Sequence, residues 1–293
     1  STKKIAILLT LLRAIFKGLQ EKEIRTIRDV YYSNVELYGD QKKVDYWLST
    51  IAMSFKLPSK EYLNIVPAQK GLCFTPLQID IDTGGTKSFI AKDTSSLIPY
   101  IKQDSKLTVA GHESTRLNLI VLEKEAIYNK LIENSSSHYL FKDTIIITGK
   151  GYPDFLTRLF LNKLQPFANC IQSWNIFTDA DPHGIDIALK YIQNDINPCY
   201  KCERLQYKGA RISQLLNYKS VQFLKLTQRD VSLAIKLLLK LTNEPIPQIV
   251  NKPFVTELQR QLFFYKKAEM NGMGKDHFFS SPSLSTTILN ASL

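Results

Sequence analysis

Residues 174–187 read WNIFTDADPHGIDI, and this stretch decides the fold. Its apolar beginning predicts a buried strand that ends at Asp179 and Asp181. At Pro182-His183-Gly184 the chain is then predicted to turn into a helical pattern. In open α/β sheets, ligands bind just outside the carboxyl ends of the strands. Two carboxylates at such an end therefore predict a site for a divalent cation.

The neighbouring sequence repeats this alternation of strand and helix. Apolar runs at 119–122, 145–147 and 176–177 are each followed by a helical pattern, which predicts an α/β fold with a parallel sheet covered on both faces. Each predicted strand also ends in chemically useful residues, namely Glu123, the loop Thr148-Gly149-Lys150-Gly151, and Asp179 with Asp181.

Three acids follow these predicted strands. Glu123, Asp179 and Asp181 offer the oxygen ligands that Mg²⁺ prefers. The alternative is that one acid caps a helix while the others are solvated. His183 beside them contacts a phosphate or hydrogen-bonds locally to the turn. The loop 148–151 lacks the Walker spacing, so we do not expect ATP binding.

The N-terminal part has a different pattern. Helical periodicity covers 3–20, and then 22–32 and 41–55. In the first of these segments the predicted apolar face consists of Ile5, Leu8, Leu9, Leu12, Ile15, Phe16 and Leu19. Extended segments at 72–74 and 88–90 flank the turn Asp82-Thr83-Gly84-Gly85 and predict a hairpin. Three helices followed by a hairpin are typical of a winged helix, which we expect to end near residue 105.

Composition narrows the class of partner. The 293 residues carry a net charge of +11, which favours a polyanionic partner such as nucleic acid. Four cysteines do not form a disulfide framework, and this predicts a reducing, intracellular compartment. Cys199 and Cys202 are either half of a zinc site or two free thiols. The polar tail from Asn271 is expected to be loosely ordered.

A basic domain joined to a Mg²⁺ site suggests phosphoryl transfer, and Tyr32 is a candidate nucleophile. Arg28 lies four residues earlier and so shares its helical face. A phenol with a pKa of about 10 needs such a cation or a base to react at neutral pH. The alternative is that Tyr31 and Tyr32 are both core aromatics.

Several short motifs together resemble one known family, the A-type subunits of type IIB topoisomerases (topoisomerase VI) and the meiotic recombination initiators descended from them. The motifs are Arg28-Asp29-Val30-Tyr31-Tyr32, Lys70-Gly71, Val121-Leu122-Glu123-Lys124, Thr148-Gly149-Lys150-Gly151-Tyr152-Pro153-Asp154, Arg158-Leu159 and Asp179-Ala180-Asp181-Pro182-His183-Gly184. The resemblance is greatest to fungal members and runs from about residue 24 to 242.

This resemblance implies a domain order and a reaction. A winged-helix domain over 1–105 would hold the catalytic Tyr32, a Toprim domain over 106–270 would bind Mg²⁺, and 271–293 would be a flexible tail. Tyr32 would attack a DNA phosphodiester and become linked to the 5′ phosphate, with Arg28 on the phosphate. The implied metal ligands are Glu123, Asp179 and Asp181, and the implied DNA contacts are Lys70, Lys150 and His183.

The resemblance also implies partners and a place of action. Cleavage would require a homodimer whose sites combine Tyr32 of one protomer with the metal of the other, acting in the nucleus on meiotic chromosomes. A separate topoisomerase VI B-like subunit would contact the helix at 3–20. A WD-repeat protein would dock on a motif near the C-terminus, at Gln259, Arg260, Leu262, Phe263 and Phe264.

Two rival functions remain open from the residues alone. One is a non-catalytic DNA-binding scaffold of the same fold, against which the intact Tyr32, Arg28 and acidic residues argue. The other is a Mn²⁺-dependent sugar-nucleotide transferase that uses Asp179 and Asp181. The basic N-terminal domain and Glu123 on a second strand disfavour it.

Overall fold

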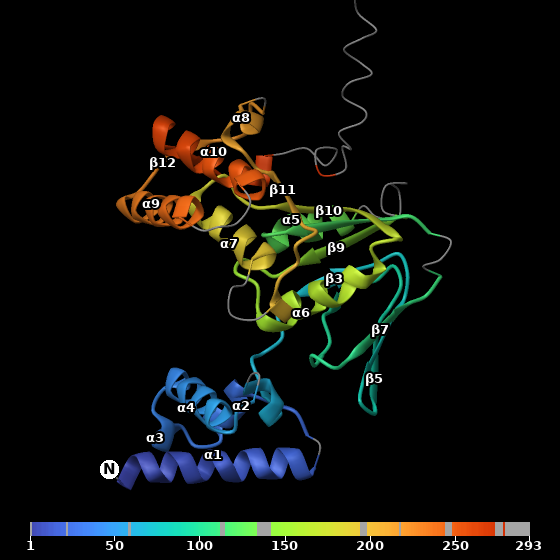
Figure 1. Ribbon diagram of the computed structural model, residues 1–293, viewed down its shortest axis with the longest axis vertical. Helices are drawn as coiled ribbons and strands as arrows, with labels where there is room; N and C mark the ends of the chain where they lie inside the picture. Colours follow the sequence, from blue (N-terminus) through green and yellow to red (C-terminus); the bar gives the residue numbers. More distant parts are fainter. Residues whose placement is uncertain are drawn as a thin grey trace, which may run out of the picture. The chain divides into compact units, whose positions relative to one another are not determined.

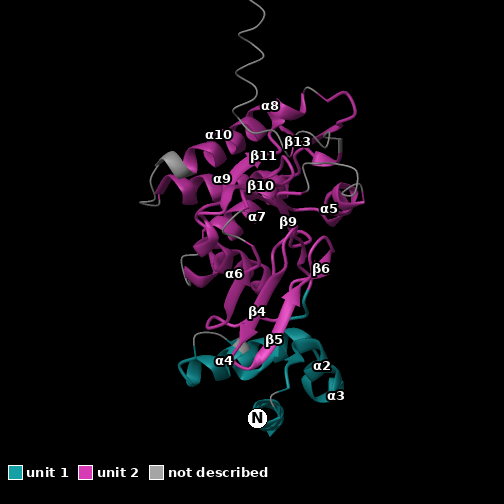
Figure 2. Ribbon diagram, turned by 90° about the vertical axis from the view of Figure 1, so that its right-hand side faces the viewer, with its two compact units in different colours: residues 1–69 teal, residues 70–293 magenta. Residues whose placement is uncertain are grey.

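The computed structural model describes residues 2–21, 23–57, 60–111, 115–133, 142–193, 198–216, 218–243, 248–272 and 278. These residues divide into two compact units, 1–69 and 70–293, each of which is described by itself (Figure 2). None of the helices in the described ranges combines the length and apolarity needed to cross a membrane.

Unit 1 is a small helical body with its own core. Its elements are α1 (Thr2–Gln20), β1 (Arg25–Thr26), α2 (Ile27–Tyr32), α3 (Val35–Tyr38), α4 (Gln41–Ser54), η1 (Lys60–Leu63) and β2 (Ile65–Val66), with β1 and β2 paired in parallel. Leu11, Val44 and Leu48 are fully buried at its centre. The helices predicted over 3–20 and 41–55 are confirmed.

Helix α2 begins later than the predicted 22, because Thr26 caps its N-terminus. The Thr26 hydroxyl accepts a hydrogen bond from the Asp29 N–H at 3.0 Å, and the Asp29 carboxylate accepts one from the Thr26 N–H at 3.1 Å. This reciprocal capping box satisfies two of the N–H groups that a helix start leaves unpaired.

The apolar face predicted for α1 is only partly right. Its member Ile15 is buried and Leu8 and Leu12 pack partly against the core, but Ile5, Leu9, Phe16 and Leu19 are exposed. The core also takes Ile7 and Leu11, which the prediction left out. Helix α1 therefore carries apolar residues on two faces, and periodicity alone does not distinguish the buried one.

Unit 2 is built on a six-stranded sheet in the order β11-β10-β8-β9-β3-β6 (Figure 1). Strands β8 (Leu117–Leu122), β9 (Thr144–Thr148), β10 (Ile171–Phe177) and β11 (Gln206–Gly209) are parallel. Strands β3 (Leu72–Phe74) and β6 (Ser96–Leu97) extend the sheet in antiparallel pairing. The parallel arrangement predicted for three strands is confirmed by β8, β9 and β10, and β11 adds a fourth parallel strand that was not predicted.

Helices cover both faces of this sheet, as expected for near-continuous apolar strands. Residues of α5 (Glu125–Ile132) pack with Ile120, Ile146 and Phe177 on one face. Residues of α6 (Phe155–Leu164) and α7 (Pro182–Ile192) pack with Val121, Ile147 and Ile176 on the other. Alternate residues of each strand thus enter two separate cores.

The predicted hairpin exists, but its pairing and its place differ from the prediction. Strands β4 (Ile79–Thr83) and β5 (Thr86–Ile90) form it, and β7 (Lys106–Val109) adds a third strand. The segment 72–74 does not pair with 88–90, because it is β3 and pairs with β9. The compact units consequently divide at residues 69 and 70, whereas composition placed the domain boundary near 105.

The remaining elements lie between the last strands of the sheet and after them in sequence. They are η4 (Gln165–Phe167), η5 (Pro198–Tyr200), α8 (Ile212–Leu215), β12 (Phe223–Lys225), α9 (Gln228–Asn243), α10 (Gln248–Phe264), β13 (Lys266–Ala268) and η6 (Met270–Gly272). The helix predicted over 254–270 ends at Phe264, because Tyr265 takes a positive φ of 51° and the chain then continues into β13. Most of the predicted tail lies outside the described residues, although Phe278 packs on Phe177.

Candidate active site

Tyr32 is the last residue of α2 and stands on its exposed face. Ile27 and Val30 anchor the other face in the core, which leaves Tyr32 60% exposed. The Arg28 guanidinium lies 5.6 Å from the centre of the Tyr32 ring. Tyr31 is partly buried against the core. The predicted pairing of Arg28 with Tyr32 on one helical face is therefore confirmed, and a phosphate reaching Tyr32 would also meet a cation.

The acids of unit 2 gather where β8 and β10 end. These strands are neighbours, with Leu122 in register with Phe177, so that Glu123 and Asp179 leave the sheet at the same edge. The Asp179 N–H donates a hydrogen bond of 2.9 Å to Glu123 Oε2. The predicted convergence of these two carboxylates is thus observed.

Burial makes this edge unfavourable for negative charge. It raises the pKa of Glu123 to about 7, and the neighbouring charge of Asp179 adds to the rise. Burial also raises the pKa of Asp179, partly offset by its contact with Lys124 and by the Met270 N–H. A divalent cation would relieve the repulsion that these carboxylates exert on each other.

Asp181 serves as the N-cap of α7. Its Oδ1 accepts a hydrogen bond of 2.6 Å from the Gly184 N–H, so the capping role foreseen as an alternative is real. Gly184 is required there, because a Cβ at this position would lie 2.2 Å from the carbonyl oxygen of Asp179. The glycine lets the start of α7 approach the Asp179 backbone and keeps Asp181 beside the other acids.

The C-terminal segment closes this edge of the sheet. Ala268 and Ala180 exchange two backbone hydrogen bonds of 2.9 and 3.1 Å. The Met270 N–H then donates to Asp179 Oδ1 at 2.9 Å. The Lys124 ammonium bridges Asp179 Oδ2 and Glu269 Oε2 at 2.8 and 2.9 Å.

The donor set suits a hard divalent cation. Within the described residues, however, no three His, Cys, Asp or Glu side chains are arranged as a ready metal cluster. Glu123 and Asp181 each engage only one carboxylate oxygen in the hydrogen bonds above. Asp179 engages both of its oxygens, one of them with Lys124. The three carboxylates could therefore hold Mg²⁺ once Asp179 is released from that ion pair.

Two of the predicted basic residues lie at the loop after β9, Lys150 within the loop and Lys70 in contact with it. The Gly151 N–H donates to the Glu123 carbonyl at 2.8 Å, which ties this loop to the end of β8. Lys150 forms an ion pair of 2.8 Å with Glu125. Lys70 hydrogen-bonds to the same loop, through its N–H to Asp154 at 3.1 Å and through its ammonium to the Tyr152 carbonyl.

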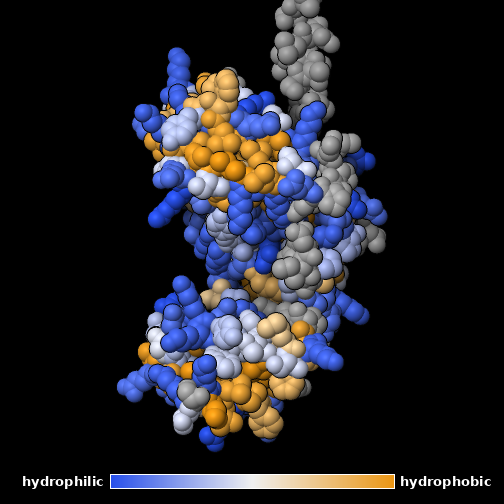
Figure 3. Space-filling view, turned by 60° about the vertical axis from the view of Figure 1, so that its left-hand side comes forward, coloured by the Kyte–Doolittle hydropathy of each residue, from blue (hydrophilic) through white to orange (hydrophobic). Residues whose placement is uncertain are grey.

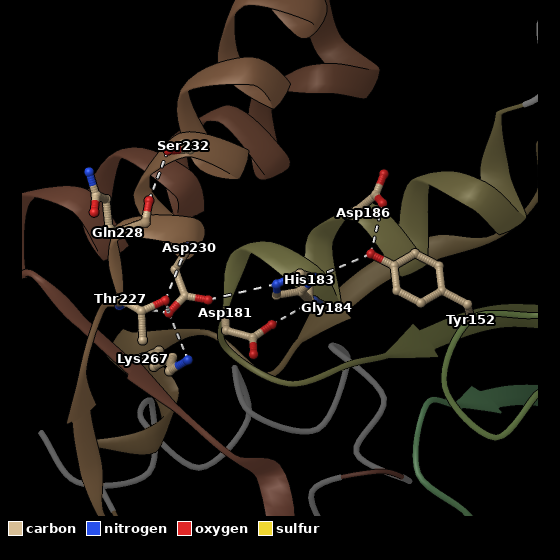
Figure 4. Close-up of polar contacts among 10 residues, drawn as sticks. All are labelled: Tyr152, Asp181, His183, Gly184, Asp186, Thr227, Gln228, Asp230, Ser232 and Lys267. Atoms are coloured by element: carbon tan, nitrogen blue, oxygen red, sulfur yellow. Dashed lines mark hydrogen bonds and ion pairs between the residues drawn. The ribbon is translucent and has the colours of Figure 1, made fainter.

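His183 belongs to a polar network beside Asp181 (Figure 4). Its Nδ1 lies 3.4 Å from the Tyr152 hydroxyl, which donates to Asp186 at 2.9 Å. Its Nε2 lies 3.8 Å from Asp230 at the start of α9. These contacts reach Tyr152 and Asp230, which are distant in sequence, rather than the turn that was predicted as the local partner of His183, and half of the His183 side chain is exposed.

Asp230 is a buried carboxylate that holds this network in place. It accepts an ion-paired hydrogen bond of 2.7 Å from Lys267 on β13 and two of 2.8 Å from the Thr227 N–H and hydroxyl. Although burial acts to raise its pKa, these donors lower the pKa of Asp230 below its usual value. Asp230 thus links α9, α7 and β13 around the acidic edge.

The predicted docking motif lies at the end of α10 and is only partly exposed. Phe263 is 83% exposed and Phe264 52%. Leu262 packs against the core, and Arg260 pairs with the buried Glu257 at 3.5 Å. Gln259 is exposed. On unit 2, Figure 3 shows an apolar patch on the face that carries α9 and α10, where Ile235 and Leu239 of α9 are also exposed.

Four residues of the site escaped prediction. Lys124 was part of a matched motif but had no assigned role, and Glu269, Asp230 and Lys267 had none either. The only sequence signal among them was the position of Lys124 directly after Glu123. The other three come from α9 and from the segment around β13, far from the acidic loop in sequence.

Comparisons with known proteins agree with this geometry. Residues 118–284 match the family model of the Toprim domain of Spo11 and the topoisomerase 6 A-type subunits, and residues 3–65 match that of type IIB DNA topoisomerase. Meiosis-specific protein SPO11 of Saccharomyces cerevisiae is 42% identical over 92% of this chain and 71% of its own length. Meiotic recombination protein rec12 of Schizosaccharomyces pombe is 32% identical over 92% of this chain and 73% of its own.

Proposed function

Because the chain belongs to the family of Spo11 and the topoisomerase 6 A-type subunits, we propose that it is a Mg²⁺-dependent DNA transesterase that forms meiotic double-strand breaks. Its relatives carry the names meiosis-specific and meiotic recombination protein, which supports action on meiotic chromosomes in the nucleus. The basic net charge of +11 suits a DNA substrate.

Tyr32 is the proposed nucleophile. Its phenol oxygen forms a bond to a backbone phosphorus while the bond from phosphorus to the 3′ oxygen breaks. The phenol gives up its proton to solvent, and the departing 3′ oxygen takes up a proton to become a hydroxyl. Arg28, on the same exposed face, binds the phosphate and stabilises the charge that develops on it.

The acidic edge of unit 2 is the proposed Mg²⁺ site. Glu123, Asp179 and Asp181 would hold the ion, which when bound would neutralise charge on the scissile backbone. Lys150 and His183 lie at the same edge and would contact neighbouring phosphates. Lys70 orients the loop through Tyr152 and Asp154, and we assign it a contact close to the cleaved strand.

We further propose that cleavage requires two copies of the chain. Each composite site would join Tyr32 of one protomer to the acids of its partner, and the winged-helix assignment of the N-terminal domain belongs to the same proposal. The exposed residues Ile5, Leu9, Phe16 and Leu19 form an apolar stripe on α1 that suits a B-like subunit. The exposed Phe263 and Phe264 suit a WD-repeat protein.

The observation that carries this proposal is the exposed Tyr32 phenol beside Arg28. We predict that Tyr32→Phe abolishes covalent protein–DNA adducts, detected as protein on 5′ ends after denaturation, and leaves DNA affinity nearly unchanged. Tyr31→Phe is the matched control, since this neighbouring tyrosine is partly buried, and it should retain adducts. Adducts that persist in Tyr32→Phe would exclude Tyr32 as the nucleophile and would assign that role to another residue, whereas the absence of adducts with wild type would favour the non-catalytic DNA-binding scaffold.

A further inference from the structure

Lys124 occupies the place on Asp179 that a metal ion would need. Its ammonium lies 2.8 Å from Asp179 Oδ2, and this carboxylate is almost fully buried. The other oxygen of Asp179 accepts the Met270 N–H at 2.9 Å. Both oxygens of this proposed ligand are therefore already engaged by groups of the same chain.

The two partners of Asp179 differ in how easily they can leave. The Met270 N–H is part of the backbone that follows β13, and the pairing of Ala268 with Ala180 fixes it. Lys124 ends in a flexible side chain that also contacts Glu269 at 2.9 Å. A cation that approaches Asp179 would therefore displace the ammonium rather than the amide.

Glu269 can remain the ion-pair partner of the Lys124 ammonium after a metal ion displaces it from Asp179. Its side chain is 57% exposed, whereas that of Asp179 is 8% exposed, so the two carboxylates offer Lys124 an outer and an inner partner. A buried carboxylate without a partner is strongly unfavourable, which makes an internal cation useful whenever no metal is bound.

We propose that Lys124 is a positioning residue that serves as the counter-ion of Asp179 in the metal-free chain and that it gives up Asp179 and keeps Glu269 as its partner when a divalent cation binds. This inference rests on the proposed metal site at Glu123, Asp179 and Asp181. It makes Lys124 a direct competitor of the metal and Glu269 the residue that weakens this competition.

The two substitutions should shift metal affinity in opposite directions. With Mn²⁺ as the probe, and free Mn²⁺ measured by electron paramagnetic resonance without DNA, Lys124→Met should bind the ion more tightly by on the order of tenfold. Glu269→Gln should bind it several-fold more weakly, because Lys124 then has Asp179 as its remaining partner. Glu269→Gln keeps the pair between Lys124 and Asp179, so the test does not depend on Lys124→Met folding well.

The double variant separates competition from simple electrostatics. If Glu269 acts through Lys124, the double variant Lys124→Met/Glu269→Gln should match Lys124→Met. Additive effects of the two substitutions would overturn the inference. Lys150→Met is the matched control, since it also removes a lysine from an ion pair of 2.8 Å at this edge, and its Mn²⁺ affinity should stay within about twofold of wild type.

The remaining outcomes distinguish this inference from the proposed function. Unchanged Mn²⁺ affinity in Lys124→Met, with wild type binding the ion, would overturn the role of Lys124 alone. An increase in Mn²⁺ affinity in Lys150→Met as large as that in Lys124→Met would also overturn the role of Lys124, because the loss of any positive charge at this edge would then explain the effect. Failure of wild type to bind Mn²⁺ would refute the proposed metal site at Glu123, Asp179 and Asp181, and with it this inference.

Discussion

At the scale of single residues, Glu123 is the acid whose ionisation the fold opposes most clearly. Burial raises its pKa to about 7 from an ordinary value of 4.5. The folded protein therefore holds a proton on Glu123 that the unfolded chain has released between these two pH values. It follows that the contribution of Glu123 to the free energy of unfolding of the metal-free protein decreases as pH rises from about 4.5 to 7.

Glu123→Gln should remove this loss of stability. The variant keeps an oxygen that can accept the Asp179 N–H but cannot ionise, so at pH 8 it should be more stable than wild type by roughly 1–3 kcal/mol. The difference should vanish near pH 4.5. Urea denaturation in a chelator at a series of pH values measures it.

The control for this pH effect is Glu125→Gln, which removes a neighbouring carboxylate that pairs with Lys150 at the surface. This variant should keep the pH profile of wild type. If the free energy of unfolding of Glu123→Gln and of wild type changed with pH in the same way, the ionisation of Glu123 would not destabilise the fold and this prediction would be wrong.

At the scale of elements, α10 separates residues that stabilise the fold from residues that are available to a partner. Phe254, Leu258 and Gln261 are buried, while Phe263 projects into solvent. Phe263→Ala should therefore change the free energy of unfolding by less than about 0.5 kcal/mol but abolish binding of the proposed WD-repeat partner. Denaturation and pull-down with the purified partner measure the two effects.

Leu258→Ala on the same helix is the contrasting variant. Leu258 is fully buried, so its truncation should destabilise the protein by about 2–5 kcal/mol. Partner binding should be lost only to the extent that the fold is lost. If Phe263→Ala destabilised the protein as much as Leu258→Ala, Phe263 would be a structural residue rather than a docking residue.

The elements also show which parts of the fold local sequence can predict. Strands β8 and β10 were predictable because each ends in a short apolar run that a helix follows, and their acids come directly after that run. Strand β3 was assigned the wrong partner, since only long-range contact decides that it pairs with β9. Similarly, Met270 reaches Asp179 across 91 residues of chain, and no local pattern marks that contact.

At the scale of the whole molecule, the proposed chemistry is divided between two compact units. Arg28 and Tyr32 belong to unit 1, and the acids with Lys124 belong to unit 2. This division permits a nucleophile and a metal site to come from different copies of the chain. Mixed dimers decide between a site formed within one chain and one shared by two.

The decisive dimer pairs a Tyr32→Phe chain with a Glu123→Gln chain, purified through different tags. If sites are composite, one site keeps both an intact tyrosine and intact acids, so plasmid should be nicked on one strand and linked to the chain that retains Tyr32. The matched dimer places both substitutions in one chain and pairs it with wild type. There each composite site lacks one component, and no cleavage should occur. Nicking by the second dimer, without nicking by the first, would show that each chain cuts with its own tyrosine and acids.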